Sequence, residues 1–251
     1  MDAYVADSSL KGKLRRRLTR LTHRRPMYTR LDRPMITFSF DDAPASAART
    51  AAAMLEARGL RGTYYISAGM IGGASEMGQL ADARDIRRLH TVGHEIGCHT
   101  LMHLDCAQTA PLEIDQDVAA NGRALADLGA PVPQTFAYPY GDVSPQAKQI
   151  LAPRFFLLRA LHHGLVELGA DLNQAPAVGI EGEDGPEIAG RWLERALARR
   201  SWLILYTHDV RDAPSPWGCT PGALERLIDR ALAADAEIVT AAEGCRLIGP
   251  G

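Results

Sequence analysis

Two adjacent carboxylates, Asp41 and Asp42, follow the β-rich run 35–40 and precede Ala43-Pro44. In a regular strand neighbouring side chains point to opposite faces, so both carboxylates reach one site only if the chain turns here. The residue before a proline favours such a turn. Together the two could divide the labour, one binding a cation and the other accepting a proton. By itself, such a pair is more often a helix N-cap or a turn.

A pair of histidines, His99 and His103, stands four residues apart. On one face of a helical turn, two such imidazoles can bind one metal through neutral nitrogens. Two histidines and one aspartate form the three-ligand pattern of catalytic zinc, which leaves positions for water and substrate. The four cysteines form no CxxC pair, which argues against a thiolate zinc site and against a dense disulfide framework.

Two further positions could take part in chemistry. His208 follows the apolar, strand-like run 202–206 and Thr207, so it stands at the carboxyl end of a predicted strand, as Asp41 does. A histidine at this place can also be structural. The turn Pro139-Tyr140-Gly141 follows the strand-like run 135–138. Such a turn can expose backbone N–H groups as an oxyanion hole, and the alternative is an ordinary connection.

Strand-like and helix-like segments that must position these residues alternate from residue 35 onward. The strand-like segments are 35–40, 63–67, 94–99, 135–138, 154–159, 202–206 and 236–239. The helix-like segments are 45–58, 79–91, 111–128, 187–200 and 221–234. This alternation predicts parallel βαβ units in an α/β fold, and about seven repeats suggest a barrel, although an open doubly wound sheet has the same periodicity.

Two connections lie between these elements. The acidic run 179–186, with Glu181, is predicted to be a solvated connection. The segment 217–221 either shapes a substrate groove through Trp217 or begins a helix, with Thr220 as the cap and Pro221 in the first turn. The helix start is the interpretation that the residue types favour.

The chain is long enough for one folded domain, at residues 34–251, preceded by a basic arm at 1–33. The arm has ten Lys and Arg residues against three Asp residues, and leucines recur in it at helical spacing, at positions 10, 14, 18 and 21. A basic amphipathic helix can lie on an anionic membrane. The alternatives are packing of the leucines on the domain or on a second subunit, which would make a homo-oligomer. We expect no nucleic-acid partner.

Neither a secretory signal nor a transmembrane segment is evident. No uninterrupted apolar stretch follows the first positive charges, and no window holds 18 or more apolar residues. We therefore expect a cytoplasmic location, with the basic arm able to bring the protein to the inner face of the membrane.

Taken in order, four motifs resemble those of the NodB-homology polysaccharide deacetylases, the fourth carbohydrate esterase family. They are TFSFDDAP, GHEIGCHTLMH, FAYPYG and LYTHD, and the likeness spans about residues 35–243. The resemblance implies a distorted (β/α)7 barrel in a single domain. Holdfast and exopolysaccharide deacetylases look like the nearest relatives.

The resemblance also implies roles for individual residues. A divalent metal would be held by three of them, Asp42, His99 and His103. Asp41 would be the general base and His208 the general acid, and the N–H of Tyr140 would help to hold an oxyanion. Zinc suits two histidines and a carboxylate, and the same ligands accept cobalt, nickel or manganese.

This chain departs from the family pattern at two places. Many members have an arginine in the third motif that contacts the base aspartate, and here Ala137-Tyr138 occupies that place. We expect Arg159, at the end of a predicted strand, to take its place; the alternative is a surface or structural arginine. The fourth motif is unassigned, because His162, His163 and Asp171 lie in its region without matching it.

The implied reaction is removal of N-acetyl groups from N-acetylhexosamine units of a bacterial exopolysaccharide or its lipid-linked precursor. An alternative is a deacylase of another amide or ester, such as a lipid-linked formamido sugar, an acetylated xylan or a cyclic ureide. A non-enzymatic glycan-binding protein is a third reading. The intact Asp41 and His208 argue against it, because binding alone needs neither a base nor an acid.

Overall fold

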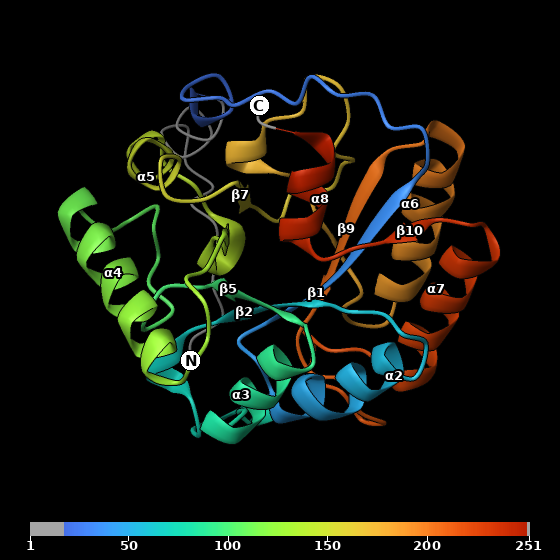
Figure 1. The fold of residues 1–251 in the computed structure, drawn as a ribbon, viewed down its shortest axis with the longest axis horizontal. Coiled ribbons are helices and arrows are strands. Elements are labelled where there is room, and N and C mark those ends of the chain that lie inside the picture. The colour runs from blue at the N-terminus through green and yellow to red at the C-terminus, as the bar shows by residue number, and fades with distance from the viewer. Residues whose placement is uncertain (1–17, 250–251) are drawn as a thin grey trace.

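Parallel strands and helices alternate along the computed structural model, which describes residues 18–249 (Figure 1). The strands are β1 Met35–Asp41, β2 Thr63–Ile66, β3 Ala74–Ser75, β4 Gly78–Gln79, β5 Glu95–Cys98, β6 Thr135–Ala137, β7 Leu157–Arg159, β8 Val178–Gly179, β9 Trp202–Thr207 and β10 Glu237–Ile238. The helices are α2 Ala52–Glu56, α3 Ala83–Thr91, α4 Pro111–Asp127, α5 Pro145–Leu151, α6 Gly185–Arg199, α7 Pro221–Ala233 and α8 Ala241–Ile248. A π-helical turn, Ala47–Ala51, precedes α2, and short 3-10 turns are Ala68–Met70, Pro139–Gly141 and Leu172–Gln174.

One curled sheet organises the domain. Its strand order is β7-β6-β5-β2-β1-β9-β8, with β10 also paired to β1, and these pairings are all parallel. The two end strands approach each other, since Arg159 in β7 forms a parallel bridge with Ala175, three residues before β8. Helices surround the sheet, with α4 and α5 on the side of β7 and with α6 and α7 beside β9 (Figure 1). The predicted distorted (β/α)7 barrel is therefore confirmed, and the open doubly wound sheet is excluded.

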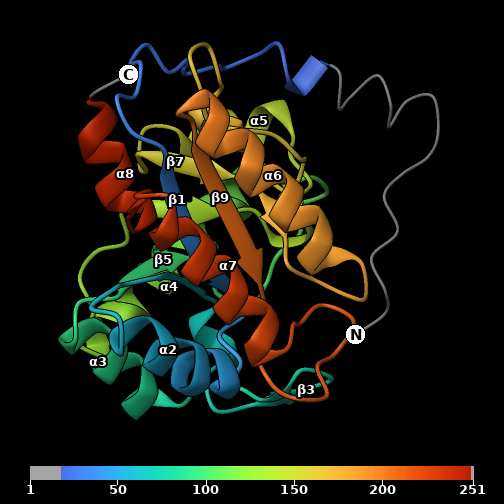
Figure 2. The ribbon, with the colours of Figure 1, turned by 90° about the vertical axis from the view of Figure 1, so that its right-hand side faces the viewer.

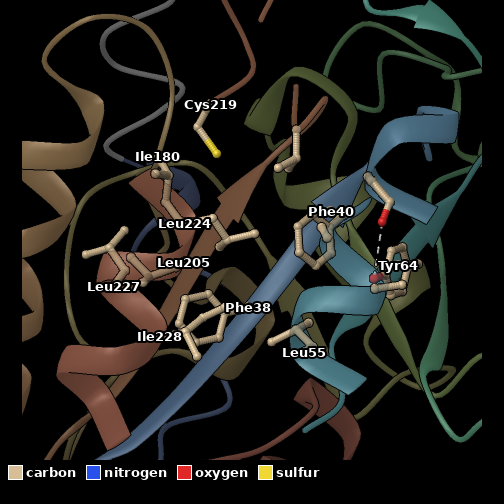
Figure 3. Packing of buried hydrophobic residues seen from close by; sticks show 14 of the residues in the cluster. Phe38, Phe40, Leu55, Tyr64, Ile180, Leu205, Cys219, Leu224, Leu227 and Ile228 are labelled. Atoms are coloured by element: carbon tan, nitrogen blue, oxygen red, sulfur yellow. Dashed lines mark hydrogen bonds between the residues drawn. The ribbon is translucent and has the colours of Figure 1, made fainter. Parts of the chain in front are cut away.

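The main core lies between the sheet and its helices. Every residue of β1 and of β9 is buried, as expected for strands that are covered on both faces. Figure 3 shows Phe38 of β1 packed among side chains of β9 and α7, including Leu205 and Ile228. Phe40 lies beside Tyr64 of β2, on which its ring stacks. This packing holds β1 in the middle of the sheet and fixes where its carboxyl end lies.

A short antiparallel hairpin, β3 with β4, occupies the place where the sequence predicted the beginning of a helix at residue 79. The helix itself, α3, begins at Ala83, because the Asp82 side chain accepts hydrogen bonds from the N–H groups of Arg84 and Asp85. The hairpin lies on the side of the sheet at which the strands have their carboxyl ends (Figure 2).

The described part of the basic arm, residues 18–33, lies along the domain. Met27 is buried and its N–H donates to the Ala170 carbonyl, while the N–H of Arg25 donates to the Asp171 carboxylate. Leu18 and Leu21 are 51% and 70% exposed, so the domain leaves half or more of each residue uncovered. The first half of the predicted amphipathic helix, with its other two leucines, lies outside the described residues, and the boundary at residue 33 stays a prediction.

No helix within residues 18–249 is long and apolar enough to cross a bilayer.

Leu205→Ala should lower the free energy of unfolding by about 2–5 kcal/mol, because the side chain is fully buried and its loss leaves a cavity. Leu112→Ala is the matched control, since Leu112 is exposed on α4 and its change should stay within about 0.5 kcal/mol. Chemical denaturation of both variants measures the difference. Equal stabilities would contradict the packing in Figure 3.

Candidate active site

The two adjacent aspartates reach one site because the chain turns at Asp42 and Ala43. Asp41 is the last residue of β1, paired in register with Tyr65 of β2. Asp42 and Ala43 have positive φ angles of 57° and 45°, a conformation that side-chain-bearing residues seldom adopt. This kink removes the strand alternation that would send the Asp42 carboxylate to the opposite face.

His99 and His103 also converge, but not on a helical turn. They lie in an irregular loop after β5, in which Thr100 and His103 have φ angles of 63° and 54°. The loop is held by side chains: the Leu101 N–H donates to Asp117 Oδ1 at 2.6 Å, and the Leu104 N–H donates to Thr100 Oγ1 at 2.8 Å. The helical-turn interpretation was wrong, although the convergence that it predicted is present.

Asp42, His99 and His103 form a cluster whose ligand atoms lie within 4.8 Å of one another. Nε2 of His99 and Nε2 of His103 lie 3.6 and 3.5 Å from Oδ1 of Asp42. This is the one cluster of metal-ligating type found within residues 18–249.

The chemistry of these donors fits a divalent metal. Oδ1 of Asp42 is buried and has no hydrogen-bond partner among the described residues. Nδ1 of His99 donates to the Ala137 carbonyl at 2.8 Å, which leaves the lone pair of Nε2 facing Asp42. Burial lowers the pKa of His99 to about 4, so the imidazole is neutral near pH 7, as a ligand must be. A buried carboxylate oxygen without a partner, 3.6 and 3.5 Å from two imidazole nitrogens, is the arrangement that a cation would complete.

Asp41 is held by Arg159. Nη2 of Arg159 lies 2.5 and 2.6 Å from the two oxygens of Asp41, and both side chains are buried. Burial alone would raise the pKa of Asp41, but Arg159 and the nearby histidines outweigh it and hold this pKa below its usual value. The guanidinium lies near the rings of Tyr65 and Tyr206, at 5.1 and 5.3 Å from their centroids. The predicted contact of Arg159 with Asp41 is thus present, and its part in catalysis stays a prediction.

His208 follows β9 and is held by a carboxylate that the sequence interpretation did not assign. Its Nδ1 lies 2.7 Å from Oε1 of Glu181 and 3.2 Å from the Trp217 carbonyl. Burial alone would lower the pKa of His208, but the Glu181 carboxylate outweighs it and raises the pKa to about 9. With Nδ1 engaged, Nε2 is the atom left to give or take a proton.

The prediction of a solvated acidic connection is therefore wrong for Glu181. Glu181 lies two residues after the short strand β8, and β8 pairs with β9, the strand that leads to His208. The signal that could have found it is the run Ala177-Val178-Gly179-Ile180, a short apolar strand that ends in an acid. The exposed Glu183 and Asp184 do belong to the solvated part of this connection.

Tyr140 lies in the turn after β6, with φ 58° and ψ 0°. Its ring stands edge-on to that of His103, with centroids 4.5 Å apart. The next residue must be small, because a Cβ on Gly141 would meet Leu161 at 2.4 Å, and its φ of 65° also favours glycine. The turn is therefore fixed beside the metal-type cluster, and the oxyanion role of the Tyr140 N–H stays a prediction.

One cavity of about 370 Å³ is lined by Asp41, by the Asp42, His99 and His103 cluster, and by Tyr140, Glu181 and His208. Its walls are completed by larger side chains, Met77, Tyr138, Leu161, Tyr206 and Trp217. Thr220 caps α7, so the predicted helix start at 220–221 is confirmed. Trp217 lines the cavity, and its part in a substrate groove stays a prediction.

The loop that carries Trp217 is tied to the β3–β4 hairpin. Asp209 is fully buried and accepts hydrogen bonds from Nε of Arg211 and from the N–H of Ser215. Nη2 of Arg211 donates to the Glu76 carbonyl at the tip of the hairpin. Two walls of the cavity thus share one anchor.

Three residues from the region of the fourth motif lie elsewhere. His162 and His163 line a different cavity. Asp171 pairs with the buried Lys148 at 2.6 Å and caps the 3-10 turn that follows it. None of the three contacts His208, whose partner is Glu181.

Glu181→Gln should lower the pKa of His208 from about 9 towards 6.5, since burial is then opposed only by the smaller effects of the Asp41 and Asp42 charges. A raised histidine pKa stabilises the fold below the unfolded value of 6.5 and loses this effect as the pH rises through about 9. The stability difference between wild type and variant should therefore be largest in acid and vanish above pH 9. Histidine NMR titration and denaturation at several pH values measure both effects. Glu183→Gln is the control, and an unchanged His208 titration in Glu181→Gln would contradict the pairing.

Comparison with known proteins gives one family. The family model described as polysaccharide deacetylase matches residues 29–153, about half of the chain. No curated protein matches.

Solved structures of similar fold are numerous. T48 deacetylase, solved with substrate, aligns with a TM-score of 0.59 at 18% identity, over 84% of this chain and 90% of its own. The family 4 acetyl xylan esterase from Clostridium thermocellum, solved with a cobalt ion, aligns with a TM-score of 0.58 at 22% identity, over 85% and 91%. The Bc1960 peptidoglycan N-acetylglucosamine deacetylase aligns with a TM-score of 0.58 at 17% identity, over 87% and 92%.

The TM-scores of these alignments establish a shared fold, and the family match adds the sequence pattern. The curled parallel sheet, the four motifs in order and the matched residues 29–153 show that this chain belongs to the polysaccharide deacetylase family, carbohydrate esterase family four.

Proposed function

We propose that this protein is a metal-dependent hydrolase that removes N-acetyl groups from N-acetylhexosamine units of a bacterial exopolysaccharide or its lipid-linked precursor. One observation carries the proposal. A single cavity brings together a cluster suited to a metal, a carboxylate held ionised and a histidine held protonated. Hydrolysis of an amide needs an electrophile, a base and an acid, and these three features supply them.

Asp42, His99 and His103 would hold the metal. A bound divalent ion would polarise the acetyl carbonyl and lower the pKa of a water towards about 7. Zinc is the first candidate for this set of ligands, with cobalt, nickel and manganese as alternatives. The similar acetyl xylan esterase was solved with a cobalt ion, which supports a divalent metal in this fold.

Asp41 would act as the general base. Arg159 keeps its carboxylate ionised and fixes both oxygens, so the group can take a proton as water attacks the acetyl carbon. The N–H of Tyr140 would help to hold the developing oxyanion.

His208 would act as the general acid. The Glu181 carboxylate holds Nδ1–H and keeps the ring protonated near pH 7, so Nε2–H can be given to the departing sugar nitrogen. The bond between the acetyl carbon and nitrogen then breaks, and the products are acetate and a free amine.

A related deacylase is the second candidate. The solved proteins of similar fold include an acetyl xylan esterase, and the same base and metal ligands would serve an ester. A lipid-linked formamido sugar or a cyclic ureide would use the same groups.

Purified protein should release acetate from N-acetylglucosamine oligomers, lose this activity with chelator and regain it with zinc. Asp41→Asn and His208→Ala should each lower kcat by roughly 10²- to 10⁴-fold, because each removes a proton-transfer group. Metal content should fall with chelator and in Asp42→Asn, while Asp184→Asn, an exposed acid, serves as the control. If the zinc-loaded wild type releases acetate neither from these oligomers, nor from acetylated xylan, nor from a lipid-linked N-acetylhexosamine, the proposed reaction class is wrong.

Arg159→Lys should lower kcat while leaving metal affinity unchanged. Lysine keeps the charge but loses the planar guanidinium that contacts both oxygens of Asp41. Steady-state kinetics and a metal titration on the same preparation separate the two effects. A kcat equal to that of wild type would show that the Asp41 contact is structural only.

A further inference from the structure

A second cavity, of about 410 Å³, shares no lining residue with the catalytic one. It lies between the basic arm, the segment after β7 and the end of α6. Its walls are rich in cationic and aromatic side chains, among them Arg20, Arg24, His162, His163, Trp192 and Arg199.

Positive charge is in excess in this cavity. Its two acidic side chains are already paired, Glu167 with Arg199 at 2.8 Å and Asp171 with Lys148 at 2.6 Å. Arg24 donates to a neutral group, the Gly169 carbonyl.

Arg20 adds a second cation without a carboxylate partner among the described residues. Burial and the nearby charge of Arg20 together lower the pKa of His162 to about 4. Both residues line the cavity, so the positive charge of Arg20 is felt inside it. The two guanidiniums, Arg20 and Arg24, therefore face this space without a paired carboxylate. Guanidinium groups of this kind favour phosphate, which they can bind with two parallel hydrogen bonds.

Exposed leucines stand next to this cavity along the chain. Leu18 and Leu21 flank Arg20, and Leu168 follows the lining residue Glu167. Their exposed fractions are 51%, 70% and 52%. Leucines beside basic residues are typical of segments that lie in a membrane interface. Tryptophan side chains such as that of Trp192, which lines this cavity, are also common at that depth.

We propose that this cavity binds the phosphate of an anionic phospholipid headgroup, so that the domain docks on a membrane with Leu18, Leu21 and Leu168 in the interface. Charge complementarity selects the headgroup, and the leucines select a lipid over a soluble phosphate. This docking is independent of the proposed deacetylation.

The orientation that follows leaves the catalytic cavity accessible. Arg199 ends α6 just before β9 begins, whereas the catalytic residues follow the carboxyl ends of β1, β5 and β9. In Figure 2 the described arm, in blue, lies at the top, and β3, whose residues line the catalytic cavity, lies at the bottom. A docked domain would present its catalytic cavity to a glycan away from the bilayer.

The test is flotation of the full chain with vesicles of phosphatidylcholine alone and of phosphatidylcholine mixed with phosphatidylglycerol. The double variant Arg20→Gln, Arg24→Gln should lower the affinity for the anionic vesicles by roughly thirtyfold, from the contribution of two basic side chains at such a surface. Arg84→Gln, Arg87→Gln is the matched control, because both residues are exposed on α3 and the change in charge is the same. The melting temperature of each variant checks that the fold is intact.

A second arm tests whether the cavity itself takes the headgroup. Glycerol phosphate should displace wild-type protein from anionic vesicles more strongly than sodium chloride does at equal ionic strength. Equal binding of the two double variants, or equal displacement by the two salts, would overturn the proposal. Absence of vesicle binding would also overturn the proposal. This holds even if the chain then binds free phosphate or RNA, or if light scattering shows a dimer formed through Leu18 and Leu21.

Discussion

The contact of Asp41 with Arg159 requires the sheet to curl. Asp41 ends β1 and Arg159 ends β7, and the sheet order places β2, β5 and β6 between these strands. In a flat sheet the two side chains would stand several strand spacings apart, at about 4.8 Å each. Their oxygens and nitrogen instead lie 2.5 to 2.6 Å apart across the interior of the curled sheet. A buried charge is costly when it lacks its partner, so this pair favours the curled sheet over a flat one.

Strained backbone gathers around the same interior. Eight residues other than glycine have positive φ within residues 18–249, and five of them lie in the loops that follow β1, β5 and β6. They are Asp42, Ala43, Thr100, His103 and Tyr140. Regular strands would send consecutive side chains to opposite faces, and these kinks turn the ligating groups into one cavity. The buried strands that end at these loops hold the kinks in place.

Two ion pairs fix the protonation states of the proposed base and the proposed acid in this cavity. Arg159 keeps the Asp41 carboxylate ionised, and Glu181 keeps the His208 imidazole protonated. Each of these partners comes from an edge of the sheet, β7 or the segment after β8, whereas Asp41 and His208 come from the interior strands β1 and β9. A base and an acid can therefore coexist in one cavity near pH 7, because the local partner outweighs burial in each case.

Residue types and their spacing were enough to predict the α/β alternation, and they singled out Asp41 and Asp42, the histidines at 99 and 103, and His208 as candidates for one site. These features are local, because period and residue type within a short window specify them. The tertiary structure decided the rest. It placed Glu181 beside His208 and Arg159 beside Asp41, and it showed that a loop with positive φ angles, not a helical turn, brings His99 and His103 together. Contacts across the interior of a curled sheet join residues more than a hundred positions apart, as Arg159 and Asp41 are, and no local pattern records which side chains meet there.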